Sequence, residues 1–245
     1  MTQCTFAENS QGMLIPSTKD VQSLRFLGVE WILVIEKEVW NPILFLCIRF
    51  RTDPVKATFR ALATNTYWES SLAGKGIMVT VRRHFPITSA FPLTSIQAKG
   101  YPDIQTRQFL HLLSAHTPLI PIFALVDFDP DGLGIMSTYK YGSVALAHEN
   151  ANLAVPSIRW LGVRINDIVQ DASDKTGLLK LSNRDRRIAT RMLEKEILEE
   201  EGTEPEWRRE LQVMLLLNVK AEIQILSSAE GLEAWLDEKL LAATS

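Results

Sequence analysis

The sequence predicts an α/β protein, built as a doubly wound parallel sheet with helices on both faces and followed by a helical C-terminal region. Two continuous apolar runs carry this prediction, WILVI at 31–35 and LIPIFALV at 119–126. Runs of this kind are typical of strands that are covered on both faces, as in a parallel sheet. Helical patterns lie between the strand candidates, and such alternation favours a doubly wound sheet.

The other elements follow from shorter patterns. Two shorter strand candidates lie at 77–80 (IMVT) and 158–163. Helices are expected where apolar residues recur at helical spacing, at 57–72, 104–115, 134–139, 183–201, 206–226 and 232–241. The chain therefore divides into a tail or linker (1–27), an α/β domain (28–175) and a helical part of the same domain (176–245).

Composition excludes several classes of protein. The 245 residues are 46% hydrophobic and 22% charged, which is ordinary for a globular protein. Only two cysteines occur, so neither a disulfide framework nor a cysteine zinc site is expected. No signal peptide is recognised, and the longest apolar run (43–48) is too short to span a bilayer, so no membrane association is expected. The net charge of −3 decides nothing about nucleic acid, because binding needs only a local basic surface.

Acidic residues follow both apolar runs. Glu36 comes directly after the first run, and Asp127 and Asp129 lie in ALVDFDPDG after the second. If the two strands are neighbours, the three carboxylates meet at the carboxyl edge of the sheet, where open α/β sheets bind ligands. Such an oxygen-rich site suits Mg²⁺ and phosphoryl transfer. The alternative is structural, because an Asp-x-Asp pair after a strand also serves as a turn or a helix N-cap.

Seven segments, in the same order along the chain, resemble one family. They are LIPS (14–17), ILVIEKE (32–38), KGYPDIQTR (99–107), LVDFDPDG (125–132), YKYGS (139–143), WLGV (160–163) and ELQVMLLLNVKAEIQIL (210–226). Together they resemble the family that contains the A subunit of topoisomerase VI and its relatives that make meiotic double-strand breaks. The resemblance implies a Toprim-type fold, and it argues against other Toprim enzymes such as primases or nucleases.

The resemblance also implies a site and a chemistry. Glu36, Asp127 and Asp129 would be the Mg²⁺ ligands, with Asp131 and Glu38 as candidates for the layer behind them. Candidate contacts to DNA phosphates are Lys99, Arg107 and Lys140, for which the alternative is an ordinary solvated charge.

Members of this family cut double-stranded DNA through a tyrosine hydroxyl, which leaves a 5′-phosphotyrosyl link. They act as homodimers with topoisomerase VI B-like subunits, and the eukaryotic members act with other meiotic break proteins. A nuclear location is therefore expected.

The resemblance leaves the nucleophile unaccounted for. None of the four tyrosines has the arginine-rich Tyr-Tyr context of the family's nucleophile, which belongs to an upstream domain; they are Tyr67, Tyr101, Tyr139 and Tyr141. This chain alone is therefore expected not to cleave DNA. The alternative function is a non-catalytic module that binds Mg²⁺ or DNA, or that dimerises.

Two segments interrupt the family pattern, one at 39–56 and one at 81–97. Deleting both leaves a continuous strand–helix–strand unit of ordinary size. Each segment begins with Val, whose codons start with GT, and ends with Lys or Gln, whose codons can end with AG. Those are the ends of a spliceosomal intron, so we hypothesise that both are retained introns. The alternative is a pair of surface loops.

Overall fold

A four-stranded parallel sheet forms the centre of the computed structural model, which describes residues 28–36, 62, 67–80, 102–169, 177–227 and 231–244. The strand order is β2-β1-β3-β4, with β1 at Trp31–Ile35, β2 at Gly76–Thr80, β3 at Ile122–Leu125 and β4 at Arg159–Gly162. Every residue of β1 and β3 is buried, as their unbroken apolar sequences predict. The predicted fold class is thereby confirmed.

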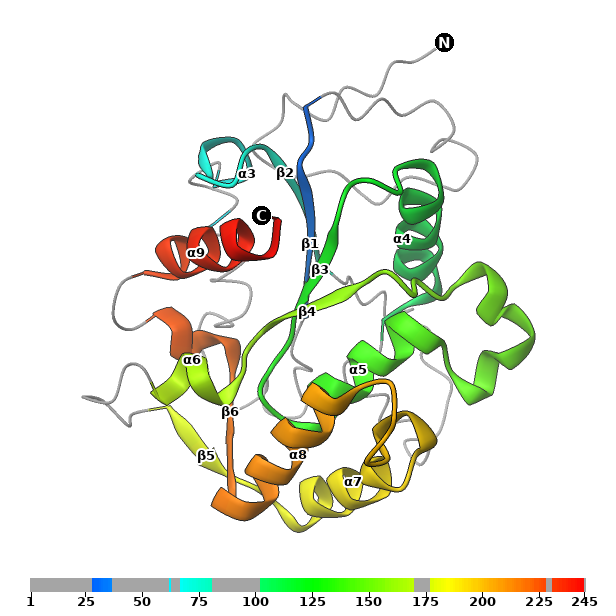
Figure 1. Ribbon diagram of the computed structural model, residues 1–245, viewed down its shortest axis with the longest axis vertical. Helices are drawn as coiled ribbons and strands as arrows, with labels where there is room; N and C mark the ends of the chain where they lie inside the picture. The colour runs from blue at the N-terminus through cyan, green and yellow to red at the C-terminus, as the bar shows by residue number, and fades with distance from the viewer. Residues whose placement is uncertain are drawn as a thin grey trace, which may run out of the picture.

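Helices cover both faces of this sheet (Figure 1). On one side lie α4 (Ile104–His116) and α5 (Pro130–Tyr141). On the other side lie α3 (Tyr67–Ser70), α6 (Ile165–Val169) and α9 (Leu232–Thr244). A long 3₁₀ segment, η2 (Val144–Asn152), connects α5 to β4. None of the helices in the described ranges is long and apolar enough to cross a membrane.

The strand order creates a switch point between β1 and β3. The chain leaves β1 toward β2 on one side, and leaves β3 toward β4 on the other. In open α/β sheets, ligands bind outside the carboxyl ends of the strands at such a point. The topology therefore directs attention to the residues that follow Ile35 and Leu125, which are paired in the sheet.

The C-terminal part is less helical than predicted. The structure has α7 (Asn183–Leu193), η3 (Glu196–Leu198) and α8 (Pro205–Leu217), but the helix expected over 206–226 ends at Leu217. Asn218 takes up a left-handed conformation there (φ 57°), which asparagine tolerates better than most residues. The chain then forms β6 (Val219–Ala221) and η4 (Ile223–Ser227).

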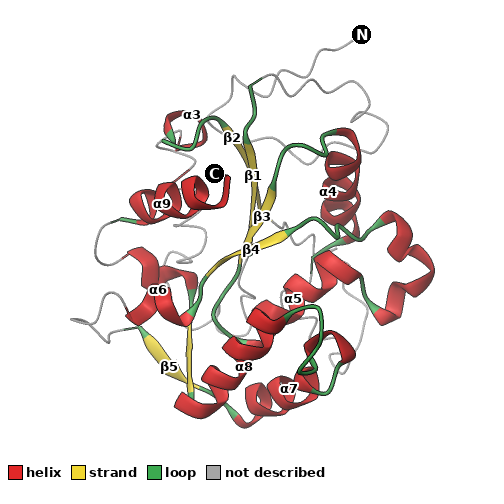
Figure 2. Cartoon of the chain, viewed as in Figure 1, coloured by secondary structure: helices red, strands yellow, loops and turns green. Residues whose placement is uncertain are grey.

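A second, two-stranded antiparallel sheet joins β6 to β5 (Leu178–Lys180) (Figure 2). Ala221 of β6 also exchanges two backbone hydrogen bonds with Phe128, at 2.8 and 3.0 Å. Phe128 lies between Asp127 and Asp129, so β6 is attached directly to the loop that follows β3. The helical prediction for this segment was wrong because long-range strand pairing outweighed local periodicity.

Candidate metal centre

Parallel pairing of β1 and β3 brings the first two predicted carboxylates together. The Glu36 N–H donates to the carbonyl oxygen of Leu125 at 2.9 Å, which extends the ladder by one residue. The Asp127 N–H in turn lies 3.4 Å from Glu36 Oε2. Both side chains are 7% exposed. Two acidic side chains, 91 residues apart in sequence, therefore share one edge of the sheet.

The third carboxylate starts α5. Asp129 is the N-cap, with extended backbone (φ −151°, ψ 168°), and its Oδ1 accepts a hydrogen bond from the Gly132 N–H at 2.7 Å. Pro130 follows at the first helical position, which its fixed φ suits. A Cβ on Gly132 would lie 2.4 Å from the carbonyl oxygen of Asp127. The Asp-Pro-Asp-Gly sequence therefore makes a tight strand-to-helix turn that keeps Asp127 and Asp129 in one loop.

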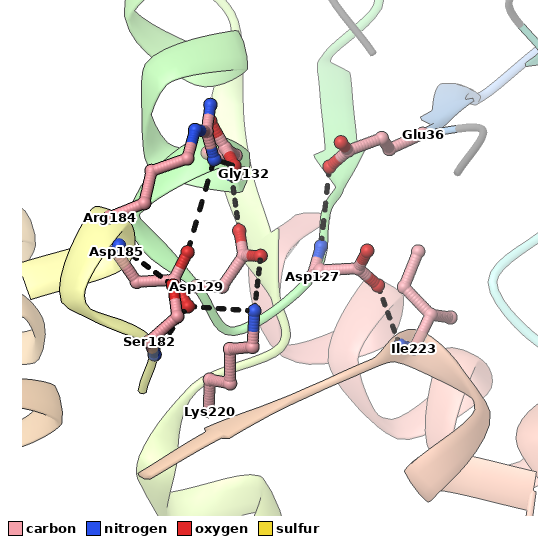
Figure 3. Close-up of polar contacts among 10 residues, drawn as sticks. Glu36, Asp127, Asp129, Gly132, Ser182, Arg184, Asp185, Lys220 and Ile223 are labelled. Atoms are coloured by element: carbon pink, nitrogen blue, oxygen red, sulfur yellow. Dashed lines mark hydrogen bonds and ion pairs between the residues drawn. The ribbon is translucent and has the colours of Figure 1, made fainter. Parts of the chain in front are cut away.

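The C-terminal segment holds the same loop from the other side (Figure 3). Asp127 Oδ1 accepts a hydrogen bond from the Ile223 N–H at 2.8 Å. The ammonium of Lys220 lies 3.9 Å from Asp129 Oδ2 and 2.9 Å from Asp185 Oδ2. Residues of η4, β6 and α7 thus surround the two aspartates of the loop after β3.

Asp131 of α5 pairs with the first turn of α7. Its carboxylate forms two hydrogen bonds with the Arg184 guanidinium, at 2.6 and 3.0 Å. This forked pair ties the start of α5 to the start of α7. The role of Asp131 behind the three expected metal ligands stays a prediction, and Glu38 lies outside the described residues.

Crowding and burial shift the titration of the three carboxylates. Burial raises the pKa of Glu36 well above its ordinary value, and the charges of Asp127 and Asp129 raise it further. Burial and the charge of Asp129 raise the pKa of Asp127 to about 7. The pKa of Asp129 is also raised, by burial first, although the Gly132 N–H and Lys220 oppose the shift. Nearby positive charge does not balance these anions, which is the situation that a bound cation relieves.

Each carboxylate also keeps one oxygen outside the hydrogen bonds made by the described residues. These oxygens are Glu36 Oε1, Asp127 Oδ2 and Asp129 Oδ2. In Figure 3 the Asp127 carboxylate turns toward Ile223 and that of Asp129 toward Gly132 and Lys220. Over the described parts of the chain, no three His, Cys, Asp or Glu side chains are gathered closely enough to hold a metal ion. The three carboxylates would therefore have to draw closer to share one ion, but their chemistry suits Mg²⁺, which accepts single carboxylate oxygens and completes its shell with water and phosphate oxygens.

The predicted phosphate contacts lie elsewhere. Arg107 is 1% exposed on the buried face of α4, where its guanidinium lies 3.4 Å from Asn150 Oδ1. Contact with DNA would require this side chain to leave the interior. Lys140 pairs with the carboxylate of Glu204, so it would have to exchange that partner for a phosphate. Lys99 lies outside the described residues.

The three described tyrosines are either buried or hydrogen-bonded to a carboxylate. Tyr67 and Tyr139 are 2% and 1% exposed. The Tyr141 hydroxyl donates to Glu204 at 2.5 Å, and burial together with that carboxylate raises its pKa. A buried or strongly hydrogen-bonded phenol is a poor nucleophile at neutral pH. Tyr101 lies outside the described residues.

Sequence reasoning did not single out three residues that contact the aspartates or their neighbours, namely Lys220, Asp185 and Ile223. Lys220 and Ile223 belong to the segment NVKAEIQIL, which was assigned to a helix. One signal for them was available in the sequence. The segment 210–226 resembles the family although it lies far from the acidic motifs, which indicates a role beyond helix formation.

Comparison with known proteins identifies the family of the chain. Residues 82–240 match the family model for the Toprim domain of Spo11 and of the topoisomerase 6 A subunit. That range includes Asp127, Asp129 and Lys220, whereas Glu36 precedes it.

Among curated relatives, a rice protein named "Meiotic recombination protein SPO11-1" is 46% identical over 133 residues, which cover 54% of this chain and 34% of the relative. The A subunit of DNA topoisomerase 6 from Arabidopsis thaliana is 39% identical over 138 residues, covering 56% and 31%. Human "Meiotic recombination protein SPO11" is 38% identical over 136 residues, covering 56% and 33%. The chain thus spans about a third of the length of these relatives. Since the family match extends over more than half of its residues, this chain belongs to the Toprim-domain family of Spo11 and the topoisomerase 6 A subunit.

Proposed function

We propose that this chain is the metal-binding Toprim portion of a type IIB topoisomerase-like transesterase that makes DNA double-strand breaks at the start of meiotic recombination. The observation that carries the proposal is the acidic edge itself. Glu36 and Asp127 lie just past the paired ends of β1 and β3, Asp129 lies in the same loop as Asp127, and burial raises the pKa of all three carboxyls. These residues would hold one Mg²⁺ through their remaining oxygens.

The reaction proposed for the whole protein is a transesterification. A tyrosine oxygen forms a bond to a backbone phosphorus while the bond from that phosphorus to the 3′ oxygen breaks, which leaves a 5′-phosphotyrosyl link. The attacking tyrosine loses its proton and the departing 3′ oxygen gains one. Mg²⁺, when bound, would stabilise negative charge on the phosphate. The residues of this chain would position that charge at the edge of the sheet, and the tyrosine would come from another domain.

The wider assignment follows from the relatives. Two of them carry meiotic recombination in their names and one is part of a topoisomerase. For the protein to which this chain belongs we therefore propose double-stranded DNA as substrate, action as a homodimer in the nucleus, and partnership with other meiotic break proteins and with a topoisomerase VI B-like subunit. Lys99 and Lys140 are proposed phosphate contacts, and Lys140 would first have to release Glu204.

The metal site is tested by titrating the purified chain with Mn²⁺ and Mg²⁺ by calorimetry. We expect millimolar or tighter binding that is lost in Asp127→Asn and retained in Glu206→Gln, which changes an exposed acid on α8 that pairs with Arg164 and not with the acidic edge. Absence of binding in the wild-type chain, or equal binding by Asp127→Asn, would overturn the assignment.

A non-catalytic role is the second candidate, favoured by the buried or hydrogen-bonded state of the described tyrosines. The two functions separate in a full-length protein that carries this domain. If it is a transesterase, the wild type forms covalent DNA–protein adducts and Asp127→Ala abolishes them. If the chain is a binding or dimerisation module, the wild type still binds metal, but neither the wild type nor Asp127→Ala forms adducts.

A further inference from the structure

The position of Lys220 is set by strand pairing. Phe128 and Ala221 exchange two backbone hydrogen bonds in antiparallel register, and both side chains are buried on one side of that pair. The neighbouring residues therefore face the other side, with Lys220 opposite Asp129 and Glu222 opposite Asp127. The backbone itself thus delivers one cation to the acidic edge.

Lys220 has two acidic neighbours at different distances. Its Nζ lies 2.9 Å from Asp185 Oδ2, which is a direct ion pair, and 3.9 Å from Asp129 Oδ2. The Lys220 side chain is 25% exposed and that of Asp185 is 3% exposed. Asp185 is therefore the nearer and the more desolvated partner, and it holds the ammonium on the α7 side of the edge.

Asp185 is itself fixed in place. It forms a capping box with Ser182 at the start of α7, in which the Ser182 N–H donates to Asp185 Oδ2 at 2.9 Å and the Asp185 N–H donates to Ser182 Oγ at 3.1 Å. A carboxylate tied to its own helix terminus cannot follow Lys220 toward Asp129. The distance between Lys220 and Asp129 is consequently controlled from α7.

Lys220 and a bound metal ion would compete for the same oxygen of Asp129, Oδ2. Oδ1 of Asp129 accepts the Gly132 N–H that starts α5, so Oδ2 is the oxygen left for a cation. Lys220 approaches that same Oδ2 without reaching hydrogen-bond distance. If the Lys220 ammonium moved to hydrogen-bond distance of Asp129 Oδ2, it would block the oxygen that a metal ion needs. Its charge would also repel a divalent cation.

We propose that Asp185 holds Lys220 back from Asp129, and that this Lys220–Asp185 pair sets how tightly the acidic edge binds a divalent cation. The inference rests on the proposed metal site. Lys220 and Asp185 act here as positioning residues, since neither is assigned to the metal itself. Figure 3 shows the arrangement, with Lys220 between the two aspartates.

The experiment is a double-mutant cycle on the full 245-residue chain, with the dissociation constant of Mn²⁺ measured by calorimetry and by the EPR signal of free Mn²⁺. Asp185→Asn keeps the shape of the side chain but releases Lys220, and we expect it to weaken binding about tenfold, as outer-shell changes do. Lys220→Met removes the competing charge and should tighten binding. In the Lys220→Met background, Asp185→Asn should lose most of its effect.

Two further variants separate this role from simple support of the fold. Lys220→Arg keeps the charge and should bind Mn²⁺ like the wild type. Ser182→Ala weakens the cap of α7 but leaves the Lys220–Asp185 pair, so it should lower stability without changing Mn²⁺ affinity. Circular dichroism shows whether each variant is folded.

The outcomes distinguish the inference from the proposed function. Unchanged affinity in Asp185→Asn, or an equal loss with and without Lys220, overturns the inference while wild-type binding and its loss in Asp127→Asn still support the metal site. No Mn²⁺ binding by the wild type overturns both.

Discussion

Asp237 on α9 accepts a hydrogen bond from the Tyr67 hydroxyl at 2.7 Å, although the two residues are 170 positions apart in the chain. The same Oδ1 accepts from Ser71 Oγ at 2.6 Å and from the Leu72 N–H at 3.1 Å. Leu236 and Leu240, on the same helix, are fully buried. The C-terminal helix is therefore fastened to the segment that leads into β2, and it completes one face of the sheet.

Replacing Asp237 by Ala should lower the free energy of unfolding by about 2 kcal/mol, because three donors lose a charged acceptor and the largely buried Tyr67 hydroxyl loses its partner. Urea denaturation followed by circular dichroism measures the change. Glu238→Ala, at the exposed next position of α9, is the matched control and should change stability little. Equal effects of the two substitutions would contradict the importance of this contact.

Gly142 should not tolerate a side chain. Its φ of +91° is left-handed, and an added Cβ would lie 2.2 Å from Asn150 Cγ. The Asn150 side chain stabilises this turn: it accepts a hydrogen bond from the Ser143 N–H at 3.0 Å and donates one to the Ser143 carbonyl oxygen at 3.1 Å. Gly142→Ala therefore combines backbone strain with a clash, and we expect a loss of about 3 kcal/mol in urea unfolding.

Gly28 supplies the control for that substitution. Its φ is also positive, at +72°, but a Cβ there would meet nothing within 4 Å. Gly28→Ala should show the strain alone, about 1 kcal/mol. If both glycine substitutions had the same effect, the contact with Asn150 would carry no energetic weight.

Acidification should weaken the attachment of α7. Burial raises the pKa of Asp185, but hydrogen bonds from Ser182 and Lys220 outweigh it, so the pKa lies below its ordinary value. A carboxyl with a depressed folded-state pKa stabilises the fold fully above its ordinary pKa of about 3.9 and loses that contribution as the pH falls through the folded value. The free energy of unfolding of the wild type, measured in urea, should therefore fall as the pH drops below about 4. In Asp185→Asn this part of the decrease should be missing. Identical profiles would contradict the depressed pKa.

The centre of the fold could be predicted because its signals are local. An unbroken apolar run such as 31–35 has no polar side to expose, so it predicts a strand buried on both faces, and the acid that follows it marks the carboxyl edge. The C-terminal segment could not be predicted in this way. Its residues have helical spacing, and only β5 and the distant Phe128 stabilise it as strand β6.

The candidate site shows the same division. Asp127 and Asp129 could be proposed as ligands because their loop follows an apolar strand, whereas Lys220 lies near Asp129 only through the tertiary pairing of β6. Arg107 was predicted to contact DNA because it is charged, yet Leu110, three residues further along α4, marks the face on which Arg107 lies as the buried one. Charge alone predicts exposure, and the helical period, which places i+3 on the same face, was the better guide.

The segments 39–56 and 81–97 give the last prediction. Both lie outside the described residues, and each follows a strand of the sheet, since β1 ends at Ile35 and β2 at Thr80. Ile35 and Thr80 are paired, so the two strands end at the same edge of the sheet. Removing both should keep every strand pairing of the four-stranded sheet and shorten the crossover to an ordinary length. We expect transcripts that lack both segments, and a shortened chain that unfolds at an equal or higher urea concentration. Mature transcripts that retain them, together with a shortened chain that fails to fold, would establish the segments as parts of the protein and reject the intron hypothesis.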